Sequence, residues 1–238
     1  MLRRIGLLTA ASLGLAACSL PSFGAPDPAT EQGREVFDLY RAFAAAATGV
    51  GVFVTVLLVY VVVRYRRRPH HDDTVPSQKP YNVPVEVVYT AVPLLIVAVL
   101  FVFSVRTEDR VSAETDSPDL VVDVVGFQWQ WQFSYVDSGI TVTGAPETGI
   151  PELVLPAERT TRLELRTTDV IHSFWVPDFL VKRDMIPGVD NAIDVTPTQV
   201  GTFDGVCAEY CGLDHGRMRF SVRVLPPDEF DEWLEAAS

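Results

Sequence analysis

The sequence contains few of the side chains that bind metals or form disulfides. Its 238 residues include three cysteines, three methionines and four histidines. So few cysteines exclude the disulfide framework of a small secreted protein, which needs several pairs. A C-x-x-C-H motif is absent, which excludes a covalently attached c-type haem. Basic residues are also scarce: 19 Lys and Arg stand against 31 Asp and Glu, a net charge of −12, and this balance disfavours nucleic acid as a partner.

Apolar residues are abundant instead; they make up 48% of the chain and concentrate in its first 105 residues. Two arginines precede an apolar stretch over residues 5–15 that is too short to span a bilayer, which predicts a signal peptide over residues 1–17. The run L-A-A-C resembles a bacterial lipobox, so Cys18 is the expected lipidated first residue of the mature chain. An uncleaved or differently cut signal is the alternative. Residues 18–40 are predicted to form an exported N-terminal tether, flexible over residues 19–33, which are rich in proline, alanine and polar residues.

Two long apolar stretches follow, over residues 42–63 and 83–105, and each is long enough for one transmembrane helix. The loop between them, residues 64–82, contains four arginines and a lysine. Because positively charged loops remain in the cytoplasm, this loop is predicted to be cytoplasmic and both outer ends face outward. The alternative is a pair of buried helices in a soluble protein. We therefore predict a transmembrane helical hairpin over residues 41–105 in a bacterial plasma membrane.

Glu86 is the one carboxylate near the start of the second apolar stretch. Ionisable groups at membrane depth are costly and usually functional, so one interpretation is a group at the entrance of a proton pathway. The other interpretation is an interfacial residue just below the apolar core. Position alone leaves both interpretations open.

From residue 106 onward the composition becomes that of a soluble β domain. Residues 120–125 form a short apolar run, and residues 162–166 and 219–224 alternate apolar and polar side chains, as half-buried strands do. Glycine and proline clusters separate such runs. We predict an all-β Greek-key sandwich or barrel over residues 106–238 on the outer face of the membrane, ending in a short amphipathic helix. This segment has 24 acidic and 10 basic side chains, a net charge of −14 that favours a basic protein partner.

The scarce metal-binding side chains of this domain gather in one motif, C-x3-C-x3-H-x2-M, formed by Cys207, Cys211, His215 and Met218. His172 is the only other histidine of the domain. Thiolate, imidazole and thioether together are ligands for a soft or borderline transition metal, copper before all others. The thioether disfavours zinc, and the second cysteine exceeds the single thiolate of a blue-copper site, which indicates a pair of coppers. The alternative is a short-range disulfide in an oxidising compartment.

These features together resemble subunit II of the haem–copper cytochrome c oxidases. The resemblance covers nearly the whole chain after the signal and includes the two-helix hairpin and the cysteine motif. Three further segments carry it: Gly-Phe-Gln-Trp-Gln-Trp at 126–131, Ile-His-Ser-Phe-Trp-Val-Pro at 171–177 and Lys-Arg-Asp-Met-Ile-Pro-Gly at 182–188. The resemblance implies a cupredoxin-like domain that holds a binuclear copper centre, CuA.

The resemblance also implies the ligands of that centre: His172, Cys207, Glu209 through its backbone carbonyl, Cys211, His215 and Met218. In that arrangement the two thiolates bridge both metals and share the odd electron between them. His172 and Met218 complete one copper, while His215 and the Glu209 carbonyl complete the other. The Glu209 carboxylate is then expected to bind magnesium at the interface with subunit I.

Further roles follow from the resemblance. Trp129 holds the position at which electrons enter from cytochrome c, and Glu86 matches the carboxylate at the entrance of the K proton pathway. Asp137 and Asp169 are expected in the docking face. The chain departs from the common family pattern at three positions, where histidine, tyrosine and an acidic residue are usual: Phe127, Gln130 and Ser134. These departures leave the identity and docking mode of the electron donor open.

The expected function is electron entry into an aa3-type or related cytochrome c oxidase. The chain would accept electrons from a c-type cytochrome and pass them to the haems of subunit I, where dioxygen is reduced to water and protons are translocated. Its expected partners are subunit I, subunit III, the donor cytochrome and membrane lipid. The alternatives are a membrane-tethered copper-delivery protein, the copper-free subunit of a quinol oxidase, and the CuA subunit of a nitric oxide reductase.

Overall fold

A computed structural model describes residues 22, 24–66, 78–145 and 149–237 of the chain. The predicted signal peptide and the lipidation site at Cys18 lie outside the described residues. The chain divides into two compact units. One unit is the helical segment Leu39–Arg106, and the other combines the residues up to Asp38 with those from Thr107 to the C-terminus.

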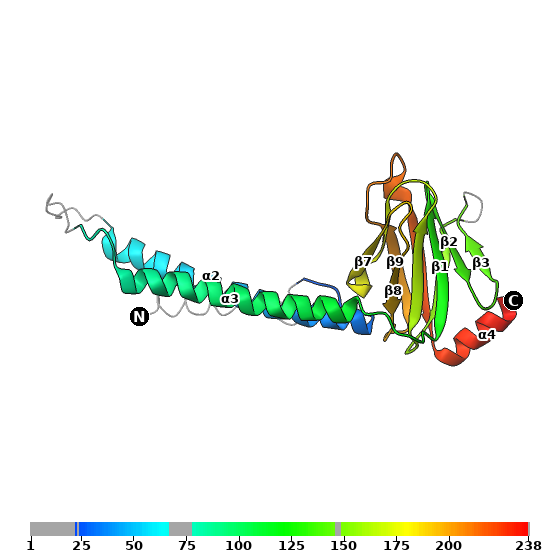
Figure 1. Ribbon diagram of the computed structural model, residues 1–238, viewed down its shortest axis with the longest axis horizontal. Coiled ribbons are helices and arrows are strands. Elements are labelled where there is room, and N and C mark those ends of the chain that lie inside the picture. The colour runs from blue at the N-terminus through cyan, green and yellow to red at the C-terminus, as the bar shows by residue number, and fades with distance from the viewer. Residues whose placement is uncertain (1–21, 23, 67–77, 146–148, 238) are drawn as a thin grey trace, which may run out of the picture. The chain divides into compact units, whose positions relative to one another are not determined.

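Two long helices contain the two predicted membrane spans: α2 over Glu31–Tyr65 and α3 over Val83–Val111 (Figure 1). Each has a window with a mean hydropathy of 2.5, and none of that window is buried within the protein. Side chains so apolar and so uncovered are stable in lipid and costly in water. Both helices are therefore long and apolar enough to cross a membrane.

The first turn of each helix is capped by a polar side chain. In α2 the backbone N–H of Gly33 donates to Thr30 Oγ1 at 2.9 Å. In α3 the backbone N–H of Asn82 donates to Glu86 Oε1 at 2.9 Å. These bonds satisfy N–H groups that have no partner inside a helix. Glu86 thus has a local structural role at the start of α3, in addition to the proton-pathway role predicted for it.

The second unit is a sandwich of two five-stranded sheets, in the orders β3-β2-β1-β5-β8 and β4-β10-β9-β6-β7 (Figure 1). Most neighbouring strands are antiparallel, but β1 pairs with β5 and β4 with β10 in parallel. The predicted all-β sandwich is confirmed. The strands are β1 Leu120–Phe127, β2 Gln130–Tyr135, β3 Thr141–Thr143, β4 Glu152–Pro156, β5 Thr161–Thr167, β6 His172–Val176, β7 Val181–Met185, β8 Asn191–Val195, β9 Gly201–Cys207 and β10 Arg219–Leu225.

The core lies between the sheets, where alternate side chains of each strand point inward. Aromatic rings dominate its centre: Trp131, Phe174 and Phe220 meet with ring centroids 4.8–6.0 Å apart. Tyr135 is buried beside them, and its hydroxyl donates to the Val154 carbonyl at 2.9 Å and accepts from the Val154 N–H at 2.8 Å. Burial raises the pKa of Tyr135 well above its ordinary value, so this hydroxyl stays neutral.

Residues shortly before α2 are bound to the β domain, which corrects part of the flexibility predicted over residues 19–33 of the tether. The N–H of Ala29 donates to Asp178 O at 2.8 Å, and the Ala29 carbonyl accepts from the Thr198 N–H at 2.8 Å. Gly33 lies so close to Phe179 that an added Cβ would be 2.5 Å from the Phe179 carbonyl oxygen. The proline-rich composition gave no sign of this attachment, because its hydrogen bonds are made by the backbone.

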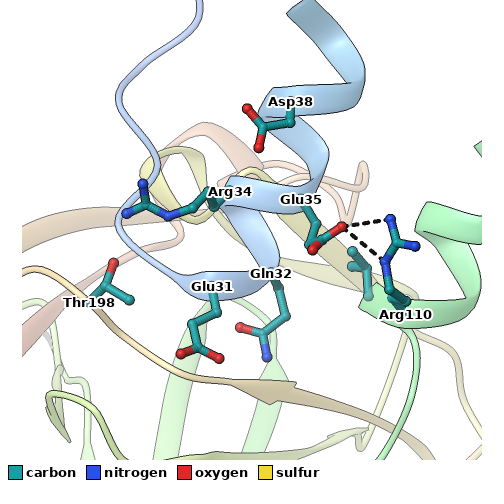
Figure 2. A pocket seen from close by; sticks show the side chains of 8 residues that line it. Glu31, Gln32, Arg34, Glu35, Asp38, Arg110 and Thr198 are labelled. Atoms are coloured by element: carbon teal, nitrogen blue, oxygen red, sulfur yellow. Dashed lines mark hydrogen bonds and ion pairs between the residues drawn. The ribbon is translucent and has the colours of Figure 1, made fainter. Parts of the chain in front are cut away.

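An ion pair joins the first turns of α2 to the last turn of α3. Arg110 donates to Glu35 Oε2 through Nε at 3.0 Å and through Nη2 at 2.7 Å. Figure 2 shows this pair beside a surface depression that Glu31, Arg34 and Thr198 also line. Because both partners are half-exposed, the pair contributes only about 0.2–1 kcal/mol.

The C-terminal helix α4, Pro227–Ala237, packs on the sandwich through its apolar face. Phe230 is buried, and the Trp233 ring meets Tyr135 with centroids 5.2 Å apart. Arg159 binds both oxygens of Asp231 at 2.6 and 2.8 Å. These contacts hold α4 at one end of the sandwich, and the loop between β9 and β10 lies at the other end (Figure 1).

Candidate metal centre

Strand pairing brings the sequence-distant His172 to the cysteine motif. His172 is the first residue of β6, and Cys207 is the last residue of the adjacent β9. The pairing of β6 with β9 places Phe174 opposite Cys207. The loop from Cys207 then passes through the short 3-10 helix His215–Arg217 and enters β10 at Arg219. All the predicted metal ligands therefore lie at one end of the sandwich.

The donor atoms of the predicted ligands converge on the two thiols. Cys207 Sγ lies 3.9 Å from Cys211 Sγ. Cys207 Sγ is also 3.8 Å from His172 Nδ1 and 3.3 Å from the Glu209 carbonyl oxygen. The ligand atoms of His172, Cys207 and Cys211 all lie within 4.8 Å of one another, a spacing suited to a shared metal site.

The second thiol has its own pair of neighbours. Cys211 Sγ lies 3.6 Å from His215 Nδ1 and 3.7 Å from Met218 Sδ. Both cysteines are free, and their sulfur atoms are far beyond the bond length of about 2.05 Å for a disulfide. The structure therefore does not contain the short-range disulfide that the sequence left open, and each thiol faces one imidazole.

Most of these donors are shielded from water. His172 is 0% exposed, Met218 1%, Cys211 3% and Cys207 6%, while Glu209 and His215 are partly exposed. Polar groups buried without a partner are costly, so a compact cluster of sulfur and nitrogen donors favours a bound metal ion.

The two thiols differ in their protonation. Burial opposes ionisation of Cys207, but contacts with the His172 imidazole and with nearby backbone outweigh it and lower its pKa to about 6. Burial and then repulsion by the Cys207 thiolate raise the pKa of Cys211 to about 12. At neutral pH the metal-free cluster thus holds one thiolate and one thiol, and binding through both sulfurs must displace a proton.

The aromatic segment over residues 126–131 forms the next layer around the donors. Gly126 lies against the His172 ring, and an added Cβ would be 3.3 Å from the ring carbon Cγ. Trp129 is half-buried, and its indole Nε1–H donates to the Cys211 carbonyl at 3.2 Å. Trp131 is fully buried and packs near the His172 ring.

Sequence reasoning missed one contact of this layer. The Nε2 of His172 lies 2.8 Å from Asp169 Oδ1, so Asp169 touches a predicted ligand directly. Burial opposes ionisation of Asp169, but the contacts with His172 and with the Gln128 and Val170 N–H groups lower its pKa below the ordinary value. The same contacts of His172 with Cys207 and Asp169 outweigh burial and raise the pKa of His172. The D-x-x-H spacing was the available signal.

The chain matches two families that together span much of its length. The family described as "Cytochrome C oxidase subunit II, periplasmic domain" matches residues 149–225, and "Cytochrome C oxidase subunit II, transmembrane domain" matches residues 19–107.

Relatives from actinobacteria are similar along nearly the whole chain. A probable cytochrome c oxidase subunit 2 of Streptomyces coelicolor is 39% identical over 267 residues, which cover 97% of this chain and 83% of the relative. The cytochrome c oxidase subunit 2 of Mycobacterium bovis is 31% identical, over 96% of this chain and 79% of the relative. The crystal structure of the periplasmic domain of subunit II of cytochrome oxidase of Bradyrhizobium japonicum is 34% identical, over 52% of this chain and 96% of that domain, with a TM-score of 0.47. The chain therefore belongs to the cytochrome c oxidase subunit II family.

Proposed function

We propose that this chain is the electron-entry subunit of a haem–copper cytochrome c oxidase and holds a binuclear CuA centre in its periplasmic, cupredoxin-like domain. The observation that carries the proposal is the convergence of two thiols, two imidazoles, a thioether and a backbone carbonyl at one end of the sandwich. Family membership supports it, because this is the subunit type named in the matched relatives.

The donor set fits copper in its chemistry. Sulfur-rich sites with imidazole select copper over harder cations, and the thioether of Met218 is a poor ligand for zinc. The two thiols lie close enough to share metal ions, with the Glu209 carbonyl and His172 beside Cys207. A copper pair bound here would supply one-electron storage shared between two metals. His172, Cys207, Glu209, Cys211, His215 and Met218 would hold it.

The surrounding residues keep the site rigid and dry. His172 and Cys207 lie on paired strands, and the buried ring of Trp131 packs near His172. Fixed ligands that exclude water need little rearrangement when the charge of the site changes. Because fast electron transfer needs little rearrangement, this part of the structure suits an electron relay.

Trp129 is the proposed point of electron entry. Trp129 is partly exposed, and its Nε1–H donates to the carbonyl of Cys211, whose sulfur belongs to the donor cluster. The acidic domain attracts a basic donor, which we propose to be a c-type cytochrome. Asp137 is exposed and available to such a partner.

The remaining assignments extend the same proposal. Subunit I and subunit III of the oxidase are the proposed membrane partners, and electrons pass from this chain to the haems of subunit I, for reduction of dioxygen to water coupled to proton translocation. The Glu209 carboxylate is proposed to bind magnesium at that interface. Glu86 is proposed as the entrance of a proton pathway, and Cys18 as a lipidated anchor in the membrane.

Copper analysis and EPR of the purified complex test the proposal. An electron shared equally by two copper nuclei gives a seven-line hyperfine pattern, which a single-copper site cannot give. We expect this pattern in the wild-type complex and its loss in Cys207→Ser, with the copper of subunit I retained. No copper beyond the subunit I atom would refute the proposal and favour a copper-free quinol-oxidase subunit.

Two other outcomes would redirect the proposal. Copper that exchanges readily with a chelator and gives no binuclear signal would favour a copper-delivery protein. A binuclear signal in a complex that reduces nitric oxide and not dioxygen would favour a nitric oxide reductase subunit.

A further inference from the structure

We propose that the depression beside the Glu35–Arg110 ion pair binds the headgroup of a zwitterionic phospholipid that carries a primary amine (Figure 2). The observation behind it is a cavity lined by charges of both signs, at the residues that connect the two membrane-crossing helices to the β domain. The inference rests on these helices and not on the proposed copper centre, so either can fail without the other.

The depression has a volume of about 460 Å³ and is formed by three segments that are separate in sequence. Its lining side chains come from the first turns of α2, the last turn of α3 and Thr198, which lies between β8 and β9. All of them belong to the same compact unit. Three carboxylates and two guanidinium groups line the depression, which gives it a net charge of −1. A cavity of this size with both signs of charge suits a small ligand that also carries both signs.

The lining side chains begin where the apolar stretches of the helices end. Asp38 stands four residues before the apolar stretch over residues 42–63, and Arg110 stands five residues after the stretch over residues 83–105. At a rise of about 1.5 Å per residue, these distances along the helix axes are about 6 and 8 Å. The polar headgroup layer on each side of a bilayer is about 5–8 Å thick. The membrane end of the depression is therefore at the depth of lipid phosphate and amine groups.

Several lining groups have no partner of their own. Arg110 and Glu35 bind each other, whereas the exposed side chains of Arg34 and Glu31 form no ion pair within the described part of the chain. The hydroxyl oxygen of Thr198 is buried in the wall and has no hydrogen-bond partner among the described residues. The depression thus retains polar groups that the protein itself does not satisfy.

The chemistry of two of these groups matches the two charges of the headgroup. A guanidinium group binds two phosphate oxygens at once, and arginine side chains near the ends of membrane helices extend toward the interface. A carboxylate accepts hydrogen bonds from an ammonium group. Arg34 is therefore the phosphate ligand, and Glu31, three residues before it on the same helix face, is the amine ligand.

The walls of the depression are fixed before a ligand binds. The N–H of Glu31 donates to the Thr196 carbonyl at 3.0 Å, and the Thr196 N–H donates to Gln32 Oε1 at 3.0 Å. The Glu35–Arg110 pair joins α2 to α3 on the other side. A site held in this way loses little conformational freedom on binding, which favours affinity.

Native mass spectrometry of the purified oxidase complex tests the binding. The complex is washed in detergent to remove loosely held lipid and is then titrated with dioleoyl phosphatidylethanolamine, phosphatidylcholine or phosphatidylglycerol. We expect the wild type to bind an ethanolamine lipid that Arg34→Gln binds about tenfold more weakly, because the variant loses a charge-assisted contact with phosphate. The choline lipid, whose amine has no N–H, and the anionic glycerol lipid should bind the wild-type site about tenfold more weakly than the ethanolamine lipid.

Arg106→Gln is the matched control, because Arg106 is an exposed arginine one turn before Arg110 on α3 and does not line the depression. This variant should bind the ethanolamine lipid as the wild type does. Equal lipid binding by Arg34→Gln and the wild type would overturn the proposal. An equal loss in Arg34→Gln and Arg106→Gln would overturn it as well, because any arginine near the interface would then have the same effect.

A second variant tests the amine contact and covers a failure of Arg34→Gln to assemble. Glu31→Gln should reduce the preference for the ethanolamine lipid over the choline lipid, whereas Glu108→Gln, which is exposed and outside the depression, should keep it. No preference for the ethanolamine lipid in the wild type would refute the choice of ligand. Loss of a neighbouring subunit from Arg34→Gln, with lipid binding unchanged, would show a subunit contact instead. The EPR signal of the proposed copper centre should be the same in all variants, so the two proposals are tested separately.

Discussion

A methyl group added at Gly126 should disturb the proposed copper centre more than one added beside the proposed ligand His215. The Cβ of Gly126→Ala would lie 3.3 Å from His172 Cγ and 3.4 Å from two further carbons of that side chain, closer than ordinary contacts. Neither the backbone at Gly126 nor the His172 ring can move freely. Gly126 is paired with Trp131 and Thr167 in the sheet, and the ring is hydrogen-bonded to Asp169. The imidazole must therefore move by a few tenths of an ångström.

The expected loss of stability is graded with the size of the new side chain. Overpacking a filled site costs about 1–3 kcal/mol, while replacing glycine recovers about 0.4–1 kcal/mol by restricting the unfolded chain. We therefore expect a net loss of about 1 kcal/mol for Gly126→Ala and about 2 kcal/mol for Gly126→Val.

The assay is the visible and EPR spectrum of the copper centre in the purified complex, followed during heating. The matched control is Gly216→Ala, because Gly216 is next to His215 in sequence and an added Cβ meets nothing within 4 Å. The Gly126 variants should shift the spectrum and lose it at lower temperature, whereas Gly216→Ala should match the wild type. Unchanged spectra for both Gly126 variants would refute the reasoning.

Two other predictions concern the core and the protonation of the thiols. Tyr135→Phe should lower the free energy of unfolding by about 2–3 kcal/mol, because it leaves the buried N–H and C=O of Val154 without their hydroxyl partner. Chemical denaturation measures this loss. The control is Tyr210→Phe, which should change the free energy of unfolding little because Tyr210 is exposed. Copper uptake by the metal-free chain should strengthen at least about tenfold per pH unit between pH 7 and pH 9, measured by competition titration. In that range Cys207, with its pKa lowered to about 6, is already ionised, while Cys211, with its pKa raised to about 12, must lose one proton per copper pair. A His172 imidazole that is still protonated because of its raised pKa must lose its extra proton as well. A flat profile would contradict this protonation scheme.

Local patterns predicted the fold class well, because each depends on neighbouring residues. The membrane helices follow from uninterrupted apolar runs, and strands such as β1 and β10 follow from runs and alternation of period two. The ligand spacing from Cys207 to Met218 was also local. His172 was different, because it lies 35 residues before Cys207 and only the pairing of β6 with β9 brings it close to that thiol. It could therefore be predicted as a ligand from the family resemblance but not from the spacing of the motif.

Contacts made by the backbone or across long loops were not predictable in the same way. The attachment of Ala29 to the β domain uses main-chain groups that every residue carries, so composition gave no signal. The contact of Asp169 with His172 was missed for a related reason. An aspartate three residues before a histidine resembles any surface acid until the strand and the turn at Gln128 place it under the imidazole.

The three departures from the family pattern lie on the face of the β1–β2 hairpin that points away from the donors. Side chains alternate between faces along a strand, and here Gly126 and Trp131 point inward toward His172. Phe127, Gln130 and Ser134 occupy the alternate, partly exposed positions. The inward face must fit the ligands, so substitutions there would alter the proposed metal site, whereas the outward face does not contact the donors. These departures therefore bear on the electron donor and leave the proposed copper site intact.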